Sequence, residues 1–335
     1  MASRLLIIGY GSIAKRHLKI LKKLYPASYI AILRHKKYYS QNIVGVNETF
    51  YDLKKALKFE PELVVFCNPP SKRINLLENF LKMGADLFIE KPLLDNFLDS
   101  KKIFRKALKS QSKIFVGYNL RYFESLIDFK TLIEKNTCGK IISFRAEVGS
   151  YLPEWRDKKN YENNVSANKN LGGGVLLELS HEINYLNWLF GDVNWIKASI
   201  SKQSSLKLDV EDTANIILSF KQYERESELI GNLNMDFYRR DSTRSCIAIG
   251  EKNSLKWDGI KGTVEMYDTQ KATWKIISKR KNELDNSYIK EWEYFKSLNI
   301  SSVKAINSIE ESLKVLKIIE ACKTSSIKDK KVFLK

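Results

Sequence analysis

The chain of 335 residues contains only four cysteines, six prolines and three histidines. The cysteines lie far apart and form neither a C-x-x-C pair nor a metal-ligand cluster, so we expect structural thiols and no metal site. With 44% hydrophobic residues and no low-complexity segment, the composition excludes a disordered chain and predicts a globular protein of two domains.

Long hydrophobic runs are also missing. No segment approaches the roughly 18 consecutive apolar residues that would cross a bilayer. The first strand-like segment, residues 5–8, begins so early that it leaves no room for a signal peptide. We therefore expect a cytoplasmic protein with no membrane partner.

Acidic residues are too few to balance the basic ones, and the formal net charge is +18. Clustered basic residues would indicate a nucleic-acid partner, because they release counterions on binding phosphate backbones. Here the lysines are spread along the whole chain among acidic residues, and no helix-turn-helix or zinc-finger spacing occurs. We expect no nucleic-acid partner, and the charge instead favours anionic substrates through electrostatic steering.

The most informative segment is a glycine turn near the N-terminus. Four large aliphatic residues run into G-Y-G-S-I-A at 9–14, and a helical pattern follows. In a dinucleotide-binding turn, Gly9 permits the tight bend and Gly11 lets the backbone approach the pyrophosphate. The amides of Ser12 and Ile13, at the start of the helix, then face the anion. The alternative is an ordinary glycine turn in another α/β fold.

The first third of the chain alternates between strand-like and helical patterns, as in a doubly wound parallel sheet. Strands are predicted at 5–8, 29–33, 63–67, 87–89 and 114–116, and helices at 13–25, 51–58, 71–83 and 96–109. Longer, alternating, aromatic-rich strands then follow at 140–148, 195–201, 213–220, 228–237 and 244–250, before a closing helix at 309–322. The predicted fold class is α/β. Residues 1–121 form a Rossmann-type domain, and residues 122–335 form an α+β domain with a large, mostly antiparallel open sheet.

The end of the second strand usually decides between NAD and NADP. An acidic residue there accepts the ribose hydroxyls of NAD, whereas a basic residue accommodates the 2′-phosphate of NADP. Here Arg34 and His35 follow the strand, then two lysines, and no carboxylate is available at that point. NADP is therefore the predicted cofactor. NAD remains the alternative if these are surface residues and the ribose contacts lie elsewhere.

A second polar motif, E-K-P at 90–92, directly follows a short buried strand, at the edge of the sheet where ligands collect. Lys91, fixed by the following proline, would place its ammonium over the nicotinamide and polarise the substrate oxygen. Glu90 lies at the same edge and is included in the cofactor site. The alternative is a charged loop such as any α/β protein contains.

The segment 171–191 carries the strongest catalytic pattern. Its apolar residues recur at spacings of three and four, which predicts a helix with one buried face. Glu178, His181 and Tyr185 share another face, so Glu178 is placed to fix the tautomer of the imidazole and raise its basicity. His181 would then take an alcohol proton as hydride leaves the same carbon. The alternative is a structural histidine at a helix start.

Five motifs in the correct order resemble the Gfo/Idh/MocA family of nicotinamide-dependent sugar and polyol oxidoreductases. They are the glycine turn, C-N-P-P-S at 67–71, E-K-P at 90–92, G-Y-N-L-R-Y at 117–122 and G-G-G-V-L-L-E-L-S-H at 172–181. The resemblance implies a cofactor lying in a cleft between the two domains. It also places Asn68 and Pro69 against the ribose and nicotinamide of that cofactor.

The resemblance has three departures. Family members often carry an Asp four residues before the histidine, whereas Glu178 stands three before it. Asn184 occupies a position that often carries Asp, which would alter the charge of the site or its hydroxyl preference. Arg73 stands where many members have histidine, and its role is left unassigned.

Substrate contacts are expected from three segments. Asn119 and Arg121 match the N-x-R pattern of the family near the domain junction, and a structural role for Arg121 is an equal alternative. The long irregular segment before the catalytic helix offers Trp155 for stacking on a sugar, and Arg156 and Tyr161 for binding polar groups. Asn184 completes the set.

We therefore expect an NADP- or NAD-dependent oxidoreductase that acts on a sugar, sugar nucleotide or polyol, and the long segment resembles homologues from bacterial surface-glycan biosynthesis. Two alternatives are a reductase of a non-sugar carbonyl or imine on the same fold, and a non-catalytic sensor of NADP(H). The broad sheet favours a homodimer or homotetramer, because an exposed sheet face is available for a partner.

Overall fold

The computed structural model describes residues 3–35, 43–155, 158–221, 228–298 and 308–334. The chain forms two compact units, the first comprising Met1–Tyr118 and Tyr288–Leu313, and the second Asn119–Ser287 and Lys314–Lys335. The chain thus returns to the first unit at Tyr288, and nothing in the sequence pattern indicated this return. The predicted boundary at residue 121 stays a prediction.

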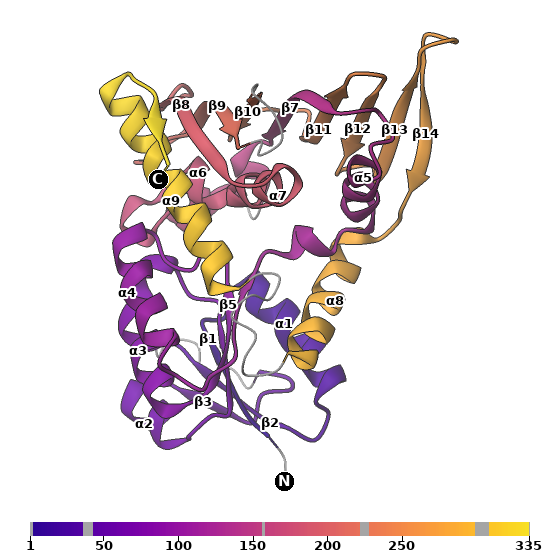
Figure 1. Cartoon of the computed structure of the whole chain (residues 1–335). Helices are drawn as coiled ribbons and strands as arrows, with labels where there is room; N and C mark the ends of the chain where they lie inside the picture. Colours follow the sequence, from indigo (N-terminus) through magenta and orange to yellow (C-terminus); the bar gives the residue numbers. More distant parts are fainter. Residues whose placement is uncertain (1–2, 36–42, 156–157, 222–227, 299–307, 335) are drawn as a thin grey trace. The chain divides into compact units, whose positions relative to one another are not determined.

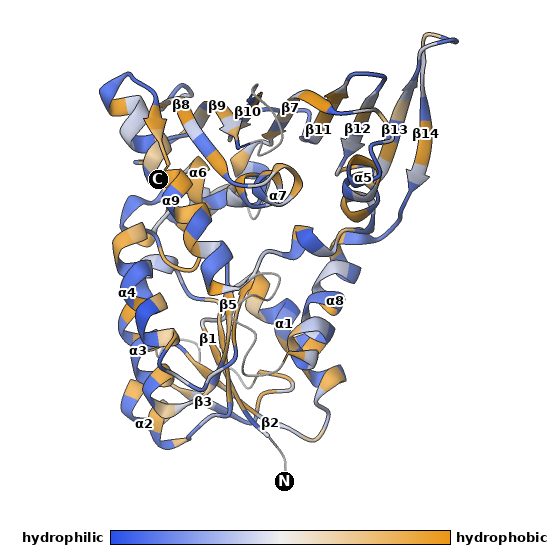
Figure 2. Cartoon of the chain, in the orientation of Figure 1, coloured by the Kyte–Doolittle hydropathy of each residue, from blue (hydrophilic) through white to orange (hydrophobic). Residues whose placement is uncertain are grey.

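The first unit is built on a parallel sheet whose strand order, in the described residues, is β3-β2-β1-β4-β5-β6. Its strands are β1 Arg4–Ile8, β2 Tyr29–Leu33, β3 Glu48–Phe50, β4 Leu63–Phe66, β5 Asp86–Glu90 and β6 Ile114–Gly117. The central strands are almost wholly apolar and buried, as is typical of a sheet covered by helices on both faces (Figure 2). The predicted doubly wound sheet is confirmed. The prediction missed β3, which is too short to show a period.

Helices cover both faces of this sheet. Helices α3 and α4 pack against each other on one side, and α1 lies on the other (Figure 1). The helices of this unit are α1 Ser12–Leu24, α2 Leu53–Lys58, α3 Ile74–Met83, α4 Phe97–Ala107 and the greater part of α8 Glu283–Ser297. A short 3-10 helix, η1 Pro70–Lys72, precedes α3.

The second unit contains a mixed sheet whose order, among the described residues, is β14-β13-β12-β11-β7-β10-β9-β8-β15. Its strands are β7 Ile141–Gly149, β8 Val193–Ser201, β9 Thr213–Phe220, β10 Leu229–Asp236, β11 Thr243–Gly250, β12 Ser254–Asp258, β13 Thr263–Asp268, β14 Thr273–Lys279 and β15 Val332–Phe333. Neighbouring strands are antiparallel except for β7 and β10, which pair in parallel. The mostly antiparallel sheet is therefore confirmed.

One face of this sheet is covered. Side chains alternate along β7, so that Phe144, Ala146 and Val148 are buried on the same face. Phe144 stacks on Phe190 of α7, with 4.9 Å between ring centroids. The helices of the unit are α5 Glu124–Glu134, α6 Val175–Glu178, α7 Ser180–Phe190 and most of α9 Ile309–Lys328, with 3-10 turns η2 Asn119–Tyr122, η3 Leu152–Glu154, η4 Lys158–Asn163, η5 Val165–Ala167 and η6 Lys169–Leu171.

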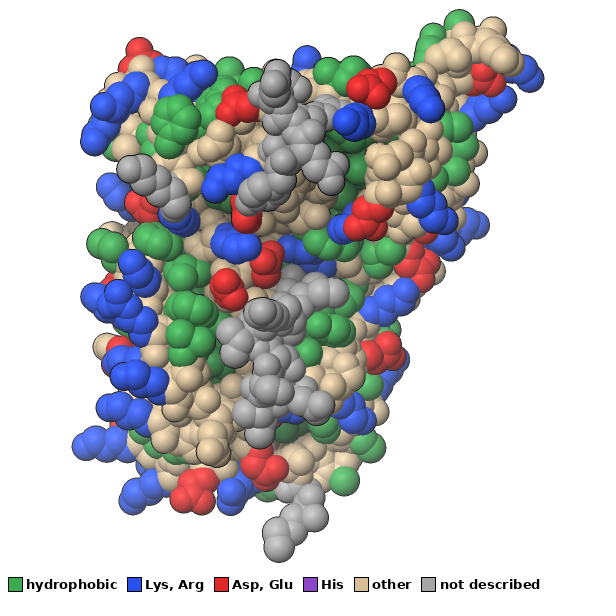
Figure 3. Space-filling model, viewed as in Figure 1, with side chains coloured by type: hydrophobic (Ala, Val, Ile, Leu, Met, Phe, Trp, Pro, Cys, Tyr) green, Lys and Arg blue, Asp and Glu red, His purple; other side chains and the backbone are tan. Residues whose placement is uncertain are grey.

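Three further findings concern the surface, the helices and possible metal ligands. On the face shown in Figure 3, Lys and Arg side chains are spread over both units rather than gathered over one element. Within the described parts of the chain, no helix has the length and apolarity needed to cross a bilayer. The same residues contain no group of three or more His, Cys, Asp or Glu side chains arranged to hold a metal ion.

A buried hydrogen-bonded chain joins α8 to the sheet of the first unit. The indole N–H of Trp292 donates to His17 Nδ1 at 2.8 Å, and His17 Nε2 lies 2.7 Å from Glu90 Oε1. Because an indole nitrogen only donates, His17 Nδ1 accepts, and the imidazole is neutral with its proton on Nε2. Nε2 therefore donates to Glu90. Stacking of Trp292 on Phe88, at 4.1 Å, holds the helix against the sheet.

Glu291 lies beside this chain as a second buried acid. Neither of its carboxyl oxygens has a hydrogen-bond partner among the described residues. Burial, reinforced by the negative charge of Glu90, raises the pKa of Glu291 well above its usual value. Both carboxyls border the space at Gly117, where an added Cβ would lie 3.5 Å from Glu291 Oε1 and 3.6 Å from Glu90 Cδ. The environment of Glu291 therefore favours its protonated form.

This raised pKa makes stability depend on pH. The folded protein keeps a proton on Glu291 that the unfolded chain releases above a pKa of about 4.5. The contribution of Glu291 to the free energy of unfolding is therefore full below that pH, and it is lost as the pH rises toward the pKa of Glu291 in the folded protein. The substitution Glu291→Gln should remove this loss. We expect its unfolding free energy, relative to wild type, to rise with pH by up to about 1.4 kcal/mol per unit, measured by urea denaturation.

The matched control is Glu293→Gln, which changes an exposed carboxyl on the same helix. A Glu291→Gln difference that stays constant between pH 5 and pH 8 would mean that Glu291 is ionised in the folded protein.

Candidate active site

The glycine turn of the first unit is shaped by close backbone contacts. Gly9 has φ +89°, and a Cβ there would lie 3.1–3.2 Å from backbone atoms of Cys67 and Asn68. Gly11 has an extended backbone with nothing within 4 Å of an added Cβ, and it caps α1 without a side-chain hydrogen bond. The first N–H groups of α1, including those of Ser12 and Ile13, have no carbonyl within the helix to bind. This end of α1 suits an anion.

The loop after β4 carries an unsatisfied acceptor. Asn68 Nδ2 donates to the carbonyl of Lys72 at 3.2 Å, whereas Asn68 Oδ1 is buried without a hydrogen-bond partner among the described residues. A buried amide oxygen of this kind calls for a donor from a ligand or a water. Pro69 follows directly and starts the turn into η1. The residues of this loop fit a bound dinucleotide.

The end of β2 presents a basic group beside the glycine turn. The guanidinium of Arg34 lies 5.4 Å from the ring centroid of Tyr10, which stands between Gly9 and Gly11. His35 is exposed at the same place. The two lysines that follow lie outside the described residues, which resume at residue 43.

Three neighbouring strands bring these groups to one edge. β1, β4 and β5 lie side by side and run parallel, and Gly9, Asn68 and Lys91 follow their carboxyl ends. Glu90, the last residue of β5, is buried and bound to His17, so its carboxylate faces the core of the unit. Lys91 is half-buried.

The thiol of Cys67, at this edge, is held in its protonated form. Burial, with a contribution from Glu90, raises the pKa of its thiol well above the usual value, and Arg73 only partly opposes the shift. A protonated thiol is a weak nucleophile. The predicted structural role of this cysteine fits its environment.

In the second unit, the three glycines of the G-G-G motif shape the entrance to α6. Gly172 and Gly174 have φ +80° and φ +106°, where other residues are strained. A Cβ at Gly173 would overlap the backbone carbonyl of Val165. The motif is therefore required by backbone geometry, and it fixes where the segment leading to His181 begins.

The prediction that one helix within 171–191 carries both Glu178 and His181 is wrong. Leu179, with φ −98° and ψ 24°, separates α6 from α7, so Glu178 ends one helix and His181 lies in the first turn of the next. Glu178 Oε2 accepts a hydrogen bond from Ser166 Oγ at 2.9 Å. His181 is half-buried. The pairing of Glu178 with His181 stays a prediction.

Two residues expected to bind substrate are bound to each other. Arg121 Nε donates to Asn184 Oδ1 at 2.7 Å, and both side chains are buried. The Arg121 guanidinium also lies 4.8 Å from the ring centroid of Trp188. Asn119 Nδ2 donates to Ser287 Oγ at 2.9 Å, likewise in the interior. These contacts fix the side chains of Arg121 and Asn119 within the second unit.

Helix α7 concentrates unsatisfied polar atoms. Ser180 Oγ, Asn184 Nδ2 and Tyr185 OH are buried without hydrogen-bond partners among the described residues. Burial raises the pKa of Tyr185 well above its usual value, so its hydroxyl remains a donor. Such atoms together in one helix are typical of a place where a ligand or ordered water binds. Sequence reasoning placed Tyr185 on the face of Glu178 and His181 but assigned it no role in the site, and it did not single out Ser180.

The segment before α6 is tied into the fold. Trp155 Nε1 donates to Ser150 Oγ at 2.6 Å, and its ring packs edge-on against Phe237. The hydroxyl of Tyr161 accepts a hydrogen bond from the backbone N–H of Lys207 at 3.1 Å. Arg156 lies outside the described residues.

Comparison with protein families matches each half of the chain. Residues 3–118 match the family described as "Oxidoreductase family, NAD-binding Rossmann fold", and residues 127–256 match the GFO/IDH/MocA C-terminal domain. Together the two matches cover most of the chain.

Curated relatives are distant. An uncharacterised oxidoreductase of Schizosaccharomyces pombe is 26% identical over 191 residues, which is 55% of this chain and 47% of the relative. Myo-inositol 2-dehydrogenase of Thermotoga maritima is 24% identical over 235 residues, 65% of each chain. The chain spans about half the length of the first curated relatives it matches.

Solved structures share the fold along the whole chain. A levoglucosan dehydrogenase in complex with NADH has a TM-score of 0.84 at 16% identity, and 100% of both chains is covered. The WlbA dehydrogenase of Chromobacterium violaceum, in complex with NADH and UDP-GlcNAcA, has a TM-score of 0.81 at 19% identity, covering 100% of this chain and 96% of its own. At these identities the likeness shows the fold alone.

Proposed function

Because the chain belongs to the Gfo/Idh/MocA family of oxidoreductases, we propose that it transfers hydride between a nicotinamide dinucleotide and a hydroxyl- or carbonyl-bearing carbon of a sugar, sugar nucleotide or polyol. One observation carries the proposal. Gly9, Asn68 and Lys91 follow three adjacent parallel strands and therefore lie at one edge of the sheet, where dinucleotides bind in this fold.

In the first unit, the N–H groups at the start of α1 bind the pyrophosphate, and Asn68 Oδ1 accepts a hydrogen bond from the ribose or the nicotinamide. The nicotinamide ring, when bound, supplies the hydride acceptor in oxidation and the donor in reduction. In oxidation His181, oriented by Glu178, removes the hydroxyl proton, and Lys91 donates a hydrogen bond to the oxygen as negative charge develops. Reduction reverses these proton transfers.

The substrate is a polar molecule with several hydroxyls. The buried Ser180, Asn184 and Tyr185 offer hydrogen-bonding groups close in sequence to His181, which suits a sugar or polyol better than an apolar carbonyl compound. The net charge of +18 favours an anionic member of the class, such as a sugar nucleotide, used in surface-glycan biosynthesis. The myo-inositol and levoglucosan dehydrogenases and the UDP-GlcNAcA complex among the relatives support this class.

The preferred cofactor in this proposal is NADP. Arg34 lies beside the glycine turn, and no acidic residue occurs between residues 24 and 48 to hold the ribose hydroxyls of NAD. The relatives in complex with NADH support NAD as the competing choice.

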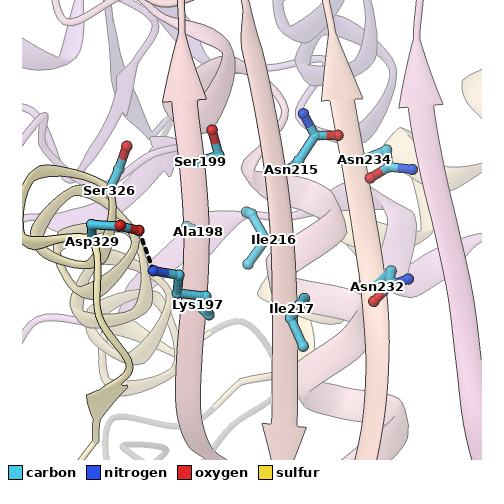
Figure 4. A pocket seen from close by; sticks show the side chains of 10 residues that line it. All are labelled: Lys197, Ala198, Ser199, Asn215, Ile216, Ile217, Asn232, Asn234, Ser326 and Asp329. Atoms are coloured by element: carbon cyan, nitrogen blue, oxygen red, sulfur yellow. Dashed lines mark hydrogen bonds and ion pairs between the residues drawn. The ribbon is translucent and has the colours of Figure 1, made fainter.

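The open face of the nine-stranded sheet is the proposed contact between copies of the chain. It carries a shallow hollow of about 350 Å³ on strands β8–β10, lined by Asn215, Asn232 and Asn234 (Figure 4). The exposed Ile217 and Ile230 lie among these polar side chains, and such a mixed face is suited to an interface with another copy.

The catalytic assignment predicts the effects of two substitutions. Both His181→Ala and Lys91→Met should lower kcat by roughly 10²- to 10⁴-fold, because the first removes the general base and the second removes the hydrogen-bond donor to the developing oxyanion. His181→Ala should leave the Kd for NADPH, measured by nicotinamide fluorescence, nearly unchanged. Lys102→Met, an exposed lysine on α4, is the control. Equal losses of turnover and cofactor affinity in His181→Ala would indicate a structural histidine.

The cofactor assignment predicts a change in preference. Arg34→Asp should weaken NADPH binding by at least tenfold and leave NADH binding unchanged or stronger, because a carboxylate repels the 2′-phosphate and accepts ribose hydroxyls. Titration of the two reduced cofactors by fluorescence measures both constants. Parallel changes in the two affinities would refute the role of Arg34.

The proposed interface predicts that the protein forms an oligomer in solution. Light scattering should give a dimer or tetramer for the wild type, and Ile217→Asp should shift it toward monomer by burying an unpaired charge. Leu98→Asp changes an exposed leucine of the first unit and should have no such effect. A wild-type monomer at micromolar concentration would exclude this interface.

A further inference from the structure

Arg73 is a buried arginine to which the sequence assigned no role. It lies between η1 and α3 in the first unit, and its residue is 3% exposed. An arginine cannot lose its proton to escape the cost of burial, so its charge must be met by hydrogen bonds.

Arg73 donates hydrogen bonds to backbone carbonyls of two loops. Nε and Nη2 donate to the carbonyl of Asn68 at 2.9 and 2.7 Å. Nη1 donates to the carbonyls of Glu90 and Pro92, with a longer contact of 3.5 Å to Leu93. One loop carries the unsatisfied Asn68 Oδ1, and the other carries Lys91 between two of the bound carbonyls.

The shape of the guanidinium suits this bridge. Its planar fork presents five N–H donors in fixed directions, so one edge binds one loop while the remaining nitrogen binds the other. A lysine has one nitrogen on a flexible stem and cannot reproduce both sets of bonds with the same geometry. The distance between the two loops is thus fixed by a rigid group.

We propose that Arg73 is a positioning residue that holds the Asn68 loop and the Lys91 loop in one arrangement for hydride transfer. The inference rests on the proposed function, because it takes Lys91 as the group that binds the substrate oxygen. Arg73 itself does not touch the reacting atoms. It acts through the backbone on either side of Lys91.

The conservative variant Arg73→Lys tests this role. It keeps the charge but loses the fork, so the Lys91 loop should shift by a fraction of an ångström to an ångström. We expect kcat to fall about 10- to 100-fold, because misplacement of this size costs that much rate. The Kd for NADPH should rise less than the kcat falls, since the glycine turn is intact. Arg145→Lys, at an exposed arginine of the second unit that also donates to a carbonyl, is the matched control.

Hydrogen exchange provides a readout that needs no substrate. In Arg73→Lys, amide exchange should accelerate in peptides covering residues 67–73 and 90–95, and peptides of β9 should be unchanged. A second variant, Arg73→Ala, should regain turnover on addition of guanidinium at concentrations that leave the wild type unaffected, whereas ethylammonium should not restore it. A purely structural arginine would give a lower Tm with wild-type kcat in the folded fraction.

The outcomes separate the two proposals. A wild-type protein that binds the cofactor but turns over no sugar, sugar nucleotide or polyol contradicts the proposed function. In that case the hydrogen exchange of the two loops alone tests whether Arg73 holds them in place. An active wild type with unchanged kcat in Arg73→Lys overturns the positioning role. Unchanged exchange in both loops overturns it as well.

Discussion

The hydrogen bonds of one buried guanidinium connect the loops on which the first half of the site depends. The carboxyl ends of parallel strands bring Asn68 and Lys91 to the same edge, but parallel pairing fixes only the strands and leaves the loops beyond them free to vary. Arg73 supplies the missing constraint by binding carbonyls of both loops. A rigid link of this kind is needed because catalysis requires placement to within about half an ångström.

The interior beneath this edge holds several polar groups whose charges are kept low. The charge of Arg73 is opposite to that of Glu90, and His17 is neutral because Trp292 occupies its Nδ1 with a donor. Burial, together with the negative charge of Glu90, raises the pKa of Glu291 and so favours its protonated form. A second buried anion beside Glu90 is thereby disfavoured. This balance limits the desolvation cost of placing ionisable residues in a core.

Local features of the site and the fold were predictable from the sequence. The glycine turn, the buried strands and the E-K-P loop are encoded within a few residues each, so period and spacing reveal them. No such signal marks the hydrogen bonds of Arg73 to residues 17 to 20 positions away. The same is true of the hydrogen bond between His17 and Trp292, which are 275 residues apart. The break at Leu179 also escaped prediction, because an apolar period continues through it. Ser180 emerged only from its unsatisfied hydroxyl, and that of Tyr185 added to its place on the face of Glu178 and His181, which the sequence had indicated.

The central proposal is that Lys91 and His181 act on one substrate oxygen. The most direct measurement is a crystal structure of the protein with the oxidised cofactor and a polyol or sugar nucleotide that it binds. The account predicts Lys91 Nζ and an imidazole nitrogen of His181 each about 3 Å from the same hydroxyl oxygen, with the adjoining carbon facing C4 of the nicotinamide. A complex in which either group is turned away from that oxygen, with the cofactor in place, would contradict it.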